Sequence, residues 1–275
     1  MPNAEQDPDG VPPRDPYSAQ YASHVDSPTR QRIRREVYGD EYPEDVDPRS
    51  FITRSELRSL ADALRVGPGQ TFVDLGCGHG GPGLWVARET GASVVGIDLS
   101  RPAIASAAQR AAELGVADRA RFKVADLVAT GLPDAAFDAA MSVDVLWSVP
   151  DKAAALREIA RILKPGTRFA FTNWDRDLTP PGYLPPLGDH QPLLAEADFE
   201  VERYEVQSDA ERRRAYYERL VAAEEALRHE MGVEATARLM FEAKGTLGLT
   251  DGIDYLAHSR RIVVVARRRP FSAAC

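Results

Sequence analysis

The run from Thr71 to Gly81, TFVDLGCGHGG, combines one acidic side chain with a glycine-dense turn. Its apolar start predicts a buried strand, and its glycines predict a tight turn that lets a ligand approach the backbone. Gly76, Gly78 and Gly81 satisfy the spacing G-x-G-x-x-G of dinucleotide sites, which is weak evidence by itself. The run therefore predicts a nucleotide-type cofactor beside a carboxylate.

The carboxylate of Asp74 discriminates between cofactors. At the end of a strand it would repel a pyrophosphate on the turn and attract the ammonium group of an amino acid. S-adenosylmethionine carries such an ammonium group and no phosphate. The alternative is that Asp74 only caps the turn and that the glycines only permit a sharp bend.

Further acidic residues follow the next strand-like runs. Asp98 ends the run 92–98, close to the spacing at which an acid meets ribose hydroxyls, and Asp126 ends the run 121–126, where it can accept from an adenine amino group. A lone acid after a strand is usually a turn residue or a helix cap. Recurrence at successive strand ends, where open α/β sheets bind ligands, favours the cofactor interpretation.

With these motifs, VDLGCGHG at 73–80, GIDLS at 96–100 and LKPG at 163–166, the chain resembles the class I S-adenosylmethionine-dependent methyltransferases, of the small-molecule kind common in natural-product pathways. The resemblance spans roughly residues 50–206 and a last strand near 261–267. It implies S-adenosyl-L-methionine as cofactor and S-adenosyl-L-homocysteine as product. The cofactor-binding residues that we expect are Asp74, Gly76, Cys77, Gly78, Gly80, Asp98, Leu99, Ser100, Asp126, Leu127, Val143 and Tyr21.

Alternation of strand and helix patterns predicts the fold class, α/β. Strands near 71–75, 93–97, 120–124, 137–142 and 168–173 alternate with helices near 81–90, 101–114 and 151–163, which indicates a parallel, doubly wound sheet. In the second of these helices, Ile104, Ala108, Ala111 and Leu114 are expected to line the buried face. The resemblance adds the rest: a Rossmann-like, seven-stranded sheet with its last strand antiparallel, N-terminal helices, and a helical cap inserted before that strand.

We expect four parts along the chain. They are an N-terminal arm and short helix (1–50), the cofactor-binding core (51–206), the helical cap (207–258), and the last core strand with a tail (259–275). The cap is either a cover over the substrate or a dimer interface or outer layer, and the sequence leaves these open. A Pro/Gly-rich loop at 179–188 has a length that is often functional.

Three residues are candidates for catalysis: Asp175, Asp144 and His190. Some relatives carry a His-His pair after the fourth strand, but here that place reads LWSVP, so the obvious base is missing. Asp175 follows the fifth strand, where some relatives place a substrate carboxylate. His190 adjoins the Pro-rich loop and carries an imidazole, a side chain that can serve as a base, and Asp144 precedes LWSVP. The alternatives are a loop cap for Asp175, an exposed helix start for His190 and a structural acceptor for Asp144.

Aromatic residues are the candidates for the substrate pocket: Trp147, Trp174, Tyr17 and Tyr217. We also expect Tyr17, Tyr21 and Phe51 to close the cofactor pocket from the N-terminal side. The alternative for these three is hydrophobic anchoring of an N-terminal arm.

Composition limits the partners. A net charge of −8 argues against nucleic acid as the main partner. Two cysteines give no disulfide framework and the five histidines form no metal motif, and no apolar run reaches membrane-spanning length. The expected partner is a small molecule, with no metal and no membrane, in the cytoplasm, and a homodimer is left open.

We therefore expect a methyltransferase that acts on an N, C or O atom of a small organic acceptor. Three alternatives remain: a cyclase of the same fold that keeps the cofactor without transferring methyl, an NAD-type oxidoreductase, and a non-enzymatic cofactor-sensing protein. Asp74 argues against NAD. The sensing protein would have no pocket for an acceptor.

Overall fold

The computed structural model of the chain describes residues 27–46 and 49–270. The predicted sites Tyr17 and Tyr21 therefore lie outside the described residues.

A seven-stranded sheet forms the centre of the molecule, in the order β3-β2-β1-β4-β5-β7-β6. Strands β1 to β5 are parallel to one another, and β7 is antiparallel to both β5 and β6. This confirms the predicted fold class, including the antiparallel last strand. The strands are β1 Thr71–Leu75, β2 Ser93–Asp98, β3 Ala120–Val124, β4 Phe137–Val143, β5 Leu163–Arg176, β6 Phe199–Gln207 and β7 Ser259–Arg268.

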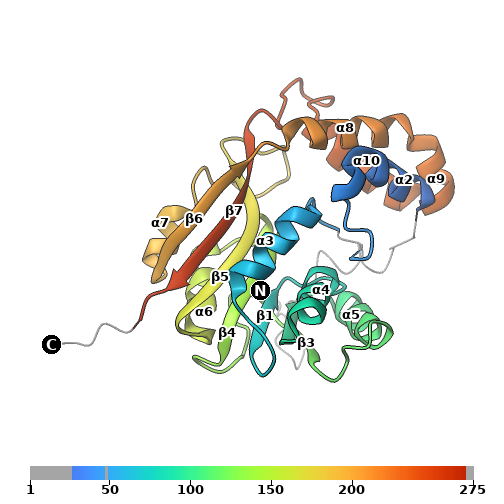
Figure 1. Ribbon diagram of the computed structural model, residues 1–275. Coiled ribbons are helices and arrows are strands. Elements are labelled where there is room, and N and C mark those ends of the chain that lie inside the picture. Colours follow the sequence, from blue (N-terminus) through green and yellow to red (C-terminus); the bar gives the residue numbers. More distant parts are fainter. Residues whose placement is uncertain (1–26, 47–48, 271–275) are drawn as a thin grey trace, which may run out of the picture.

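Helices cover both faces of the sheet, and a further group lies beyond its edge. The helices are α2 Pro28–Tyr38, α3 Arg54–Leu64, α4 Gly81–Thr90, α5 Arg101–Glu113, α6 Lys152–Ile162, α7 Gln191–Glu196, α8 Ala210–Ala222, α9 Glu224–Met231 and α10 Val233–Thr246, with short 3₁₀ turns η1 Gly39–Glu41 and η2 Leu146–Ser148. Helices α3, α4 and α5 pack on one face and α6 and α7 on the other (Figure 1). Each face therefore has its own apolar core, as expected for a doubly wound sheet.

Local sequence signals explain where these helices begin. Ser27 accepts a hydrogen bond from the Arg30 N–H at the start of α2, and Ser100 accepts one from the Ala103 N–H at the start of α5. Thr53 and Glu56 form the capping box that the sequence predicts for α3.

The predicted buried face of α5 was right at Ala111 but wrong by one position in the preceding turns. Ala103 and Ala107 are buried with Ala111, whereas Ala108 is exposed. These alanines repeat at i, i+4 and i+8, so their small side chains form one stripe that lets the helix pack closely on the sheet. Ile104 is only partly buried beside this stripe.

The cap, which we define as α8, α9 and α10, packs with α2 around a separate apolar cluster (Figure 1). The cluster joins Ile33 of α2 to Tyr216, Leu220, Leu227 and Met240 of the cap. The short N-terminal helix thus lies with the cap rather than with the sheet. The four-part division predicted from the sequence remains a prediction, with α2 packed on its third part.

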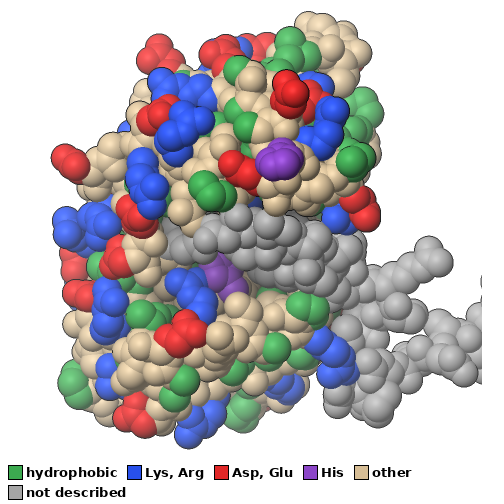
Figure 2. All heavy atoms as spheres, turned by 90° about the vertical axis from the view of Figure 1, so that its right-hand side faces the viewer, with side chains coloured by type: hydrophobic (Ala, Val, Ile, Leu, Met, Phe, Trp, Pro, Cys, Tyr) green, Lys and Arg blue, Asp and Glu red, His purple; other side chains and the backbone are tan. Residues whose placement is uncertain are grey.

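Charges of both signs are interspersed over the face of the molecule that Figure 2 shows, and its coloured side chains form no large area of one sign. None of the helices in 27–46 and 49–270 is long and apolar enough to span a membrane.

Candidate active site

A cavity of about 530 Å³ lies beyond the carboxyl ends of the parallel strands, with the cap on its other side. This volume is in the range of small-molecule sites, ~300–1,000 Å³. We name its two ends by their residues. The glycine-turn end is lined by Asp74, Gly76, Cys77, Gly78, Asp98, Leu99, Asp126, Leu127 and Val143, and the aromatic end by Trp147, Trp174, Arg176, Tyr183, Arg213, Tyr217 and Glu242.

Backbone hydrogen bonds fix the glycine turn against β2. The N–H groups of Gly76 and Cys77 both donate to the Ile97 carbonyl, at 2.8 and 2.9 Å, and the Gly78 N–H donates to Asp98 Oδ2 at 2.8 Å. Gly76 has a φ of 74°, and a Cβ there would lie 2.5 Å from the Val145 side chain. Only glycine therefore suits this position, both for conformation and for space.

Asp74 lines the cavity with a buried carboxylate, whose Oδ2 atom lies against Gly83 of α4. The residue is 2% exposed, and its Oδ2 atom has no hydrogen-bond partner in the described part of the chain. Burial, together with the nearby Asp98 charge, raises the pKa of Asp74 to about 7, although a backbone hydrogen bond from Gly83 opposes the rise. An unsatisfied buried carboxylate is costly, so this position suits a ligand that brings a positive donor.

The other two predicted acids occupy neighbouring strand ends. Asp98 accepts from the Gly78 N–H and from the Ser100 N–H at 2.9 Å, so it orders the turn and the start of α5 while lining the cavity. Asp126 lines the cavity next to Leu127, and its Oδ1 accepts from the Val128 N–H at 3.1 Å. The structure thus brings together three carboxylates that the sequence singled out.

Two predicted cofactor residues do not line the cavity. Ser100 is fully buried and caps α5, and Gly80 precedes α4 with a φ of 84°. Both shape the turn from behind its ligand-facing surface. Cys77 lines the cavity, and burial raises the pKa of its thiol well above the usual value, so it behaves as a small apolar residue.

Asp175 and His190, predicted as catalytic, lie outside the cavity in a buried cluster. His190 Nδ1 is 2.7 Å from Asp175 Oδ1, and the Tyr204 hydroxyl donates to Asp175 Oδ2 at 2.6 Å. His190 Nε2 lies 2.8 Å from the side-chain amide nitrogen of Asn173, which can only donate, so the Nδ1 proton points to Asp175. Both residues are under 5% exposed and neither lines the cavity.

This geometry favours a positioning role for the pair over the predicted catalytic role. The Asn173 side-chain oxygen accepts from the Trp147 N–H at 3.0 Å, and the Trp147 indole N–H donates to the Asp144 carbonyl at 2.8 Å. The Asp175–His190–Asn173 chain therefore holds the backbone of a residue at the aromatic end. Its members act through position and make no contact with the cavity.

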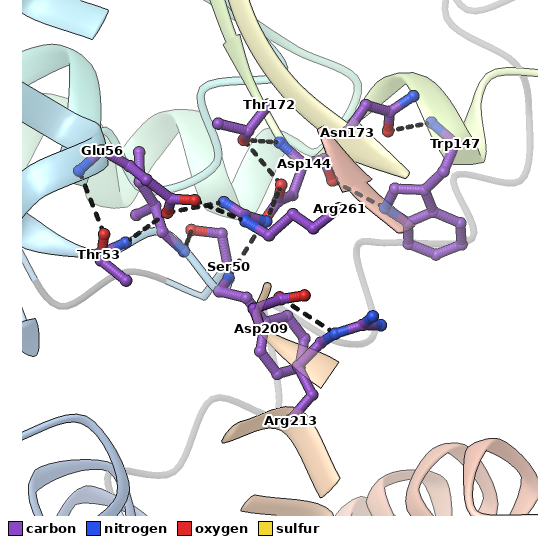
Figure 3. Close-up of polar contacts among 12 residues, drawn as sticks. Ser50, Thr53, Glu56, Asp144, Trp147, Thr172, Asn173, Asp209, Arg213 and Arg261 are labelled. Atoms are coloured by element: carbon purple, nitrogen blue, oxygen red, sulfur yellow. Dashed lines mark hydrogen bonds and ion pairs between the residues drawn. The ribbon is translucent and has the colours of Figure 1, made fainter. Parts of the chain in front are cut away.

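Asp144, the third catalytic candidate, lines the cavity but its carboxylate is fully engaged (Figure 3). Oδ1 accepts from Arg261 Nη1 at 2.6 Å and from the Thr172 hydroxyl at 2.7 Å, and Oδ2 accepts from the Phe51 N–H at 2.9 Å. These bonds favour the structural alternative for Asp144, because they leave it poorly suited to take a proton from an acceptor.

Arg261 is the centre of that cluster and is 0% exposed. Besides Asp144 it binds Glu56 through Nε and Nη2, at 3.1 and 3.3 Å (Figure 3). The two carboxylates raise the pKa of Arg261 against the effect of its burial. This one side chain therefore joins β7 to the start of α3 and to the end of β4, beneath the aromatic end.

The aromatic end includes three of the predicted pocket residues, Trp147, Trp174 and Tyr217. Phe51 also lines the cavity, with its ring edge-on to Trp174 at 5.7 Å between centroids. The ring centroid of Tyr183, in the Pro/Gly-rich loop, lies 6.0 Å from that of Trp147, so this loop contributes to the site. The cap contributes Tyr217 from α8, so part of the cap lines the cavity.

Sequence reasoning missed Arg176 and Glu242. Arg176 ends β5 two residues after Trp174, and that alternation is a signal that both face the same side. Glu242 accepts from the Tyr217 hydroxyl at 2.8 Å. No motif marks Glu242, because its place in the cavity depends on how α10 packs beside α8.

Comparison with known proteins identifies the core. Residues 73–171 match the model of the family described as methyltransferase domain. The methyltransferase GfsG of Streptomyces halstedii is 34% identical over 131 residues, covering 48% of this chain and 47% of GfsG. The 27-O-demethylrifamycin SV methyltransferase of Amycolatopsis mediterranei (strain S699) is 36% identical over 111 residues, covering 40% and 41%. The chain thus spans less than half the length of these curated relatives.

Among solved structures, the [4+2]-cyclase SpnF superposes with a TM-score of 0.71 at 25% identity, covering 92% of this chain and 95% of SpnF. The fold, the glycine turn with its acids and these matches confirm the resemblance seen in the sequence. The core is a class I S-adenosylmethionine-dependent methyltransferase domain.

Proposed function

We propose that the protein transfers a methyl group from S-adenosylmethionine to an N, C or O atom of a small organic acceptor. The observation that carries this proposal is Asp74, whose buried Oδ2 atom has no hydrogen-bond partner among the described residues. Asp74 lines the same cavity as an aromatic end built partly from the cap. One end suits the ammonium group of the cofactor, and the other suits an apolar acceptor. The presence of this second end weighs against a protein that only senses the cofactor.

The residues at hand fit S-adenosylmethionine. Asp74 would hold the ammonium, Asp98 the ribose hydroxyls, and Asp126 with Leu127 the adenine, all from strand ends that line the cavity. When bound, this cofactor supplies a methyl group that is already activated on a sulfonium. The protein's own contribution is then alignment of the acceptor and exclusion of water, which can account for several kcal/mol of the barrier.

Glu242 is the proton acceptor that we propose in place of Asp175, His190 and Asp144. It lines the aromatic end from α10, and within the described residues its carboxylate bonds only to the Tyr217 hydroxyl, whose pKa is raised by burial and by Glu242. A carboxylate held by a single neutral donor keeps lone pairs for the proton of an acceptor hydroxyl or ammonium.

Glu242→Gln should lower kcat about 100-fold or more, the usual scale of general base catalysis, with cofactor affinity unchanged within about twofold. Steady-state release of S-adenosylhomocysteine measures kcat, and calorimetric titration measures the cofactor affinity. Glu225→Gln, an exposed glutamate of the same cap, is the matched control. An unchanged kcat in Glu242→Gln would remove this residue from the mechanism.

The affinity for S-adenosylhomocysteine should fall about tenfold per pH unit as the pH is lowered from about 7 towards 5.5. Asp74 has a pKa near 7 in the free protein, and only its ionised form pairs with the ammonium, so binding below pH 7 must release a proton. Calorimetry in buffers of different ionisation enthalpy measures both the affinity and the proton release. A pH-independent affinity over this range would contradict the assignment.

The proposed function is tested by incubating the protein with methyl-labelled S-adenosylmethionine and a panel of phenols, amines and carbon acids. Label in an acceptor, with equimolar S-adenosylhomocysteine, supports methyl transfer. The likeness to SpnF favours one alternative, a cyclase that retains the cofactor without transferring its methyl group. Turnover of a polyene without label would establish that alternative instead.

The names of the relatives favour a role in natural-product metabolism. A cytoplasmic location and a homodimer remain proposals. For a dimer, the exposed apolar side chains of α10 and the turns after it, Val233, Phe241, Leu249 and Ile253, offer a contact surface.

A further inference from the structure

Arg176 is distinctive among the arginines that line the cavity. Arg213 forms an ion pair with Asp209 at 3.1 Å and donates to the Ser259 carbonyl at 3.0 Å. The guanidinium of Arg176, by contrast, makes no hydrogen bond or ion pair with any residue in 27–46 or 49–270. Its contacts are with aromatic faces, at 5.3 Å from the Trp147 ring centroid and 5.9 Å from that of Trp174.

The surroundings of Arg176 are low in polarity and include two further cations, Arg213 and Lys152, and one carboxylate, Glu242. Burial lowers the pKa of Arg176, with Arg213 adding to the effect, and the pKa of Lys152 is lowered by burial and by Arg176. Glu242 lies near enough to attract Arg176, yet it binds Tyr217 and forms no ion pair with the guanidinium. A partly buried guanidinium has five N–H donors, and leaving them without hydrogen-bond acceptors costs free energy. A ligand with such an acceptor would remove this cost.

A cofactor whose ammonium binds Asp74 would hold its own carboxylate too far from Arg176 to be that ligand. Asp74 is in register with Met141 of β4, which is in register with Ala170 of β5. Arg176 is six residues further along β5, about 20 Å at ~3.3 Å per residue, and two strands across. The carboxylate of an amino acid whose ammonium binds Asp74 stays close to Asp74.

We propose that the acceptor is an anion: it carries a carboxylate, sulfonate or phosphate group that pairs with the Arg176 guanidinium, on an apolar or aromatic body that contacts Trp147, Trp174 and Tyr183. This inference rests on the proposed function and names its substrate class. The planar guanidinium presents parallel N–H groups to an anion while its faces lie against the rings. The anionic group of the substrate supplies the hydrogen-bond acceptor that the protein does not provide for Arg176.

A matched pair of fluorescent probes tests this proposal without turnover. The protein, saturated with S-adenosylhomocysteine, is titrated with 8-anilinonaphthalene-1-sulfonate and with N-phenyl-1-naphthylamine, which has the same rings and no charge. Arg176→Gln should weaken binding of the sulfonate about tenfold or more, the scale of a lost charge-assisted hydrogen bond, and change that of the neutral amine less than about twofold. Arg176→Lys, which keeps the charge but not the planar fork, should lie between.

The control is Arg260→Gln, an exposed arginine of β7 that pairs with Asp177 and should change neither affinity. The proposal is overturned if the wild type shows no saturable binding of the sulfonate, if Arg176→Gln leaves that binding unchanged, or if it weakens both probes equally. Loss of S-adenosylhomocysteine affinity in Arg176→Gln would also overturn it, by assigning Arg176 to the cofactor. The probe titration needs no methyl transfer. It can therefore be interpreted even if the protein proves not to be a methyltransferase.

Discussion

Asp74→Asn is expected to weaken S-adenosylhomocysteine binding by roughly 30-fold to a few thousandfold, corresponding to about 2–5 kcal/mol for the loss of one partner of a buried charge pair. Asparagine has nearly the same shape, so the turn and the cavity remain. What changes is the charge that faces the ammonium group. Calorimetric titration at pH 8 measures the effect, and the pH dependence of the affinity should disappear with it.

The same substitution should stabilise the unliganded protein at pH 8. The pKa of Asp74 is raised from its ordinary value to about 7 in the folded state, so the folded protein binds the proton more tightly than the unfolded chain does. Stability is therefore lost as the pH rises from about 4 to 7, and the loss is complete above 7. At low pH, where Asp74 is protonated in both the folded and the unfolded states, the stabilities of the wild type and the variant should converge.

Thermal unfolding with and without S-adenosylhomocysteine separates the two effects. The free variant should melt at or above the wild-type temperature at pH 8, and the ligand-induced rise should be much smaller than in the wild type. Asp118→Asn, at an exposed aspartate, should behave as the wild type in both respects. An Asp74→Asn protein that binds normally would disprove the ammonium assignment.

The glycine-turn end could be predicted from the sequence because its signals are local. A buried strand, an acid, glycines and a helix start all fall within residues 71–82, and the parallel sheet then brings the acids of later strands to the same edge. Strand boundaries were predicted well for the same reason. The exception is β5, which starts at Leu163, paired with Phe137 of β4, and continues to Arg176 through its pairing with β7.

The aromatic end could be predicted only in part, because it depends on which face of β5 meets the cap. Successive residues of a strand point to opposite faces, so Trp174 and Asp175 could not both line the cavity. The sequence does not say which one does. In the structure Trp174 and Arg176 face the cavity, while Asn173 and Asp175 face His190 and Tyr204.

Glu242 illustrates a different limit. It lies 66 residues after Arg176, on a helix whose position is set by packing against α8 and α9. The helical pattern predicts that α10 exists, but only tertiary packing decides which of its side chains meets the cavity. Residues that act together from core and cap are therefore the part of the site that one sequence predicts least well.

Arg261→Met is expected to be the most destabilising of the substitutions considered, at about 3–5 kcal/mol, a large share of the ~5–15 kcal/mol that stabilises a typical domain. Methionine keeps much of the apolar stem but leaves Glu56 and Asp144 buried without their shared cation. The side chains of these carboxylates are only 11% and 6% exposed, so water cannot replace the guanidinium.

Chemical denaturation measures this loss, with Arg260→Met as the matched control on the preceding residue of β7. Arg260 is exposed and pairs with Asp177 at 2.9 Å, so its replacement should cost no more than about 1 kcal/mol. If charge burial is the cause, adding Glu56→Gln and Asp144→Asn to Arg261→Met should recover part of the stability, because the uncompensated carboxylates are then gone. Equal stability of Arg261→Met and Arg260→Met would refute this account, and with it the inference that Arg261 holds β7, α3 and β4 together beneath the aromatic end.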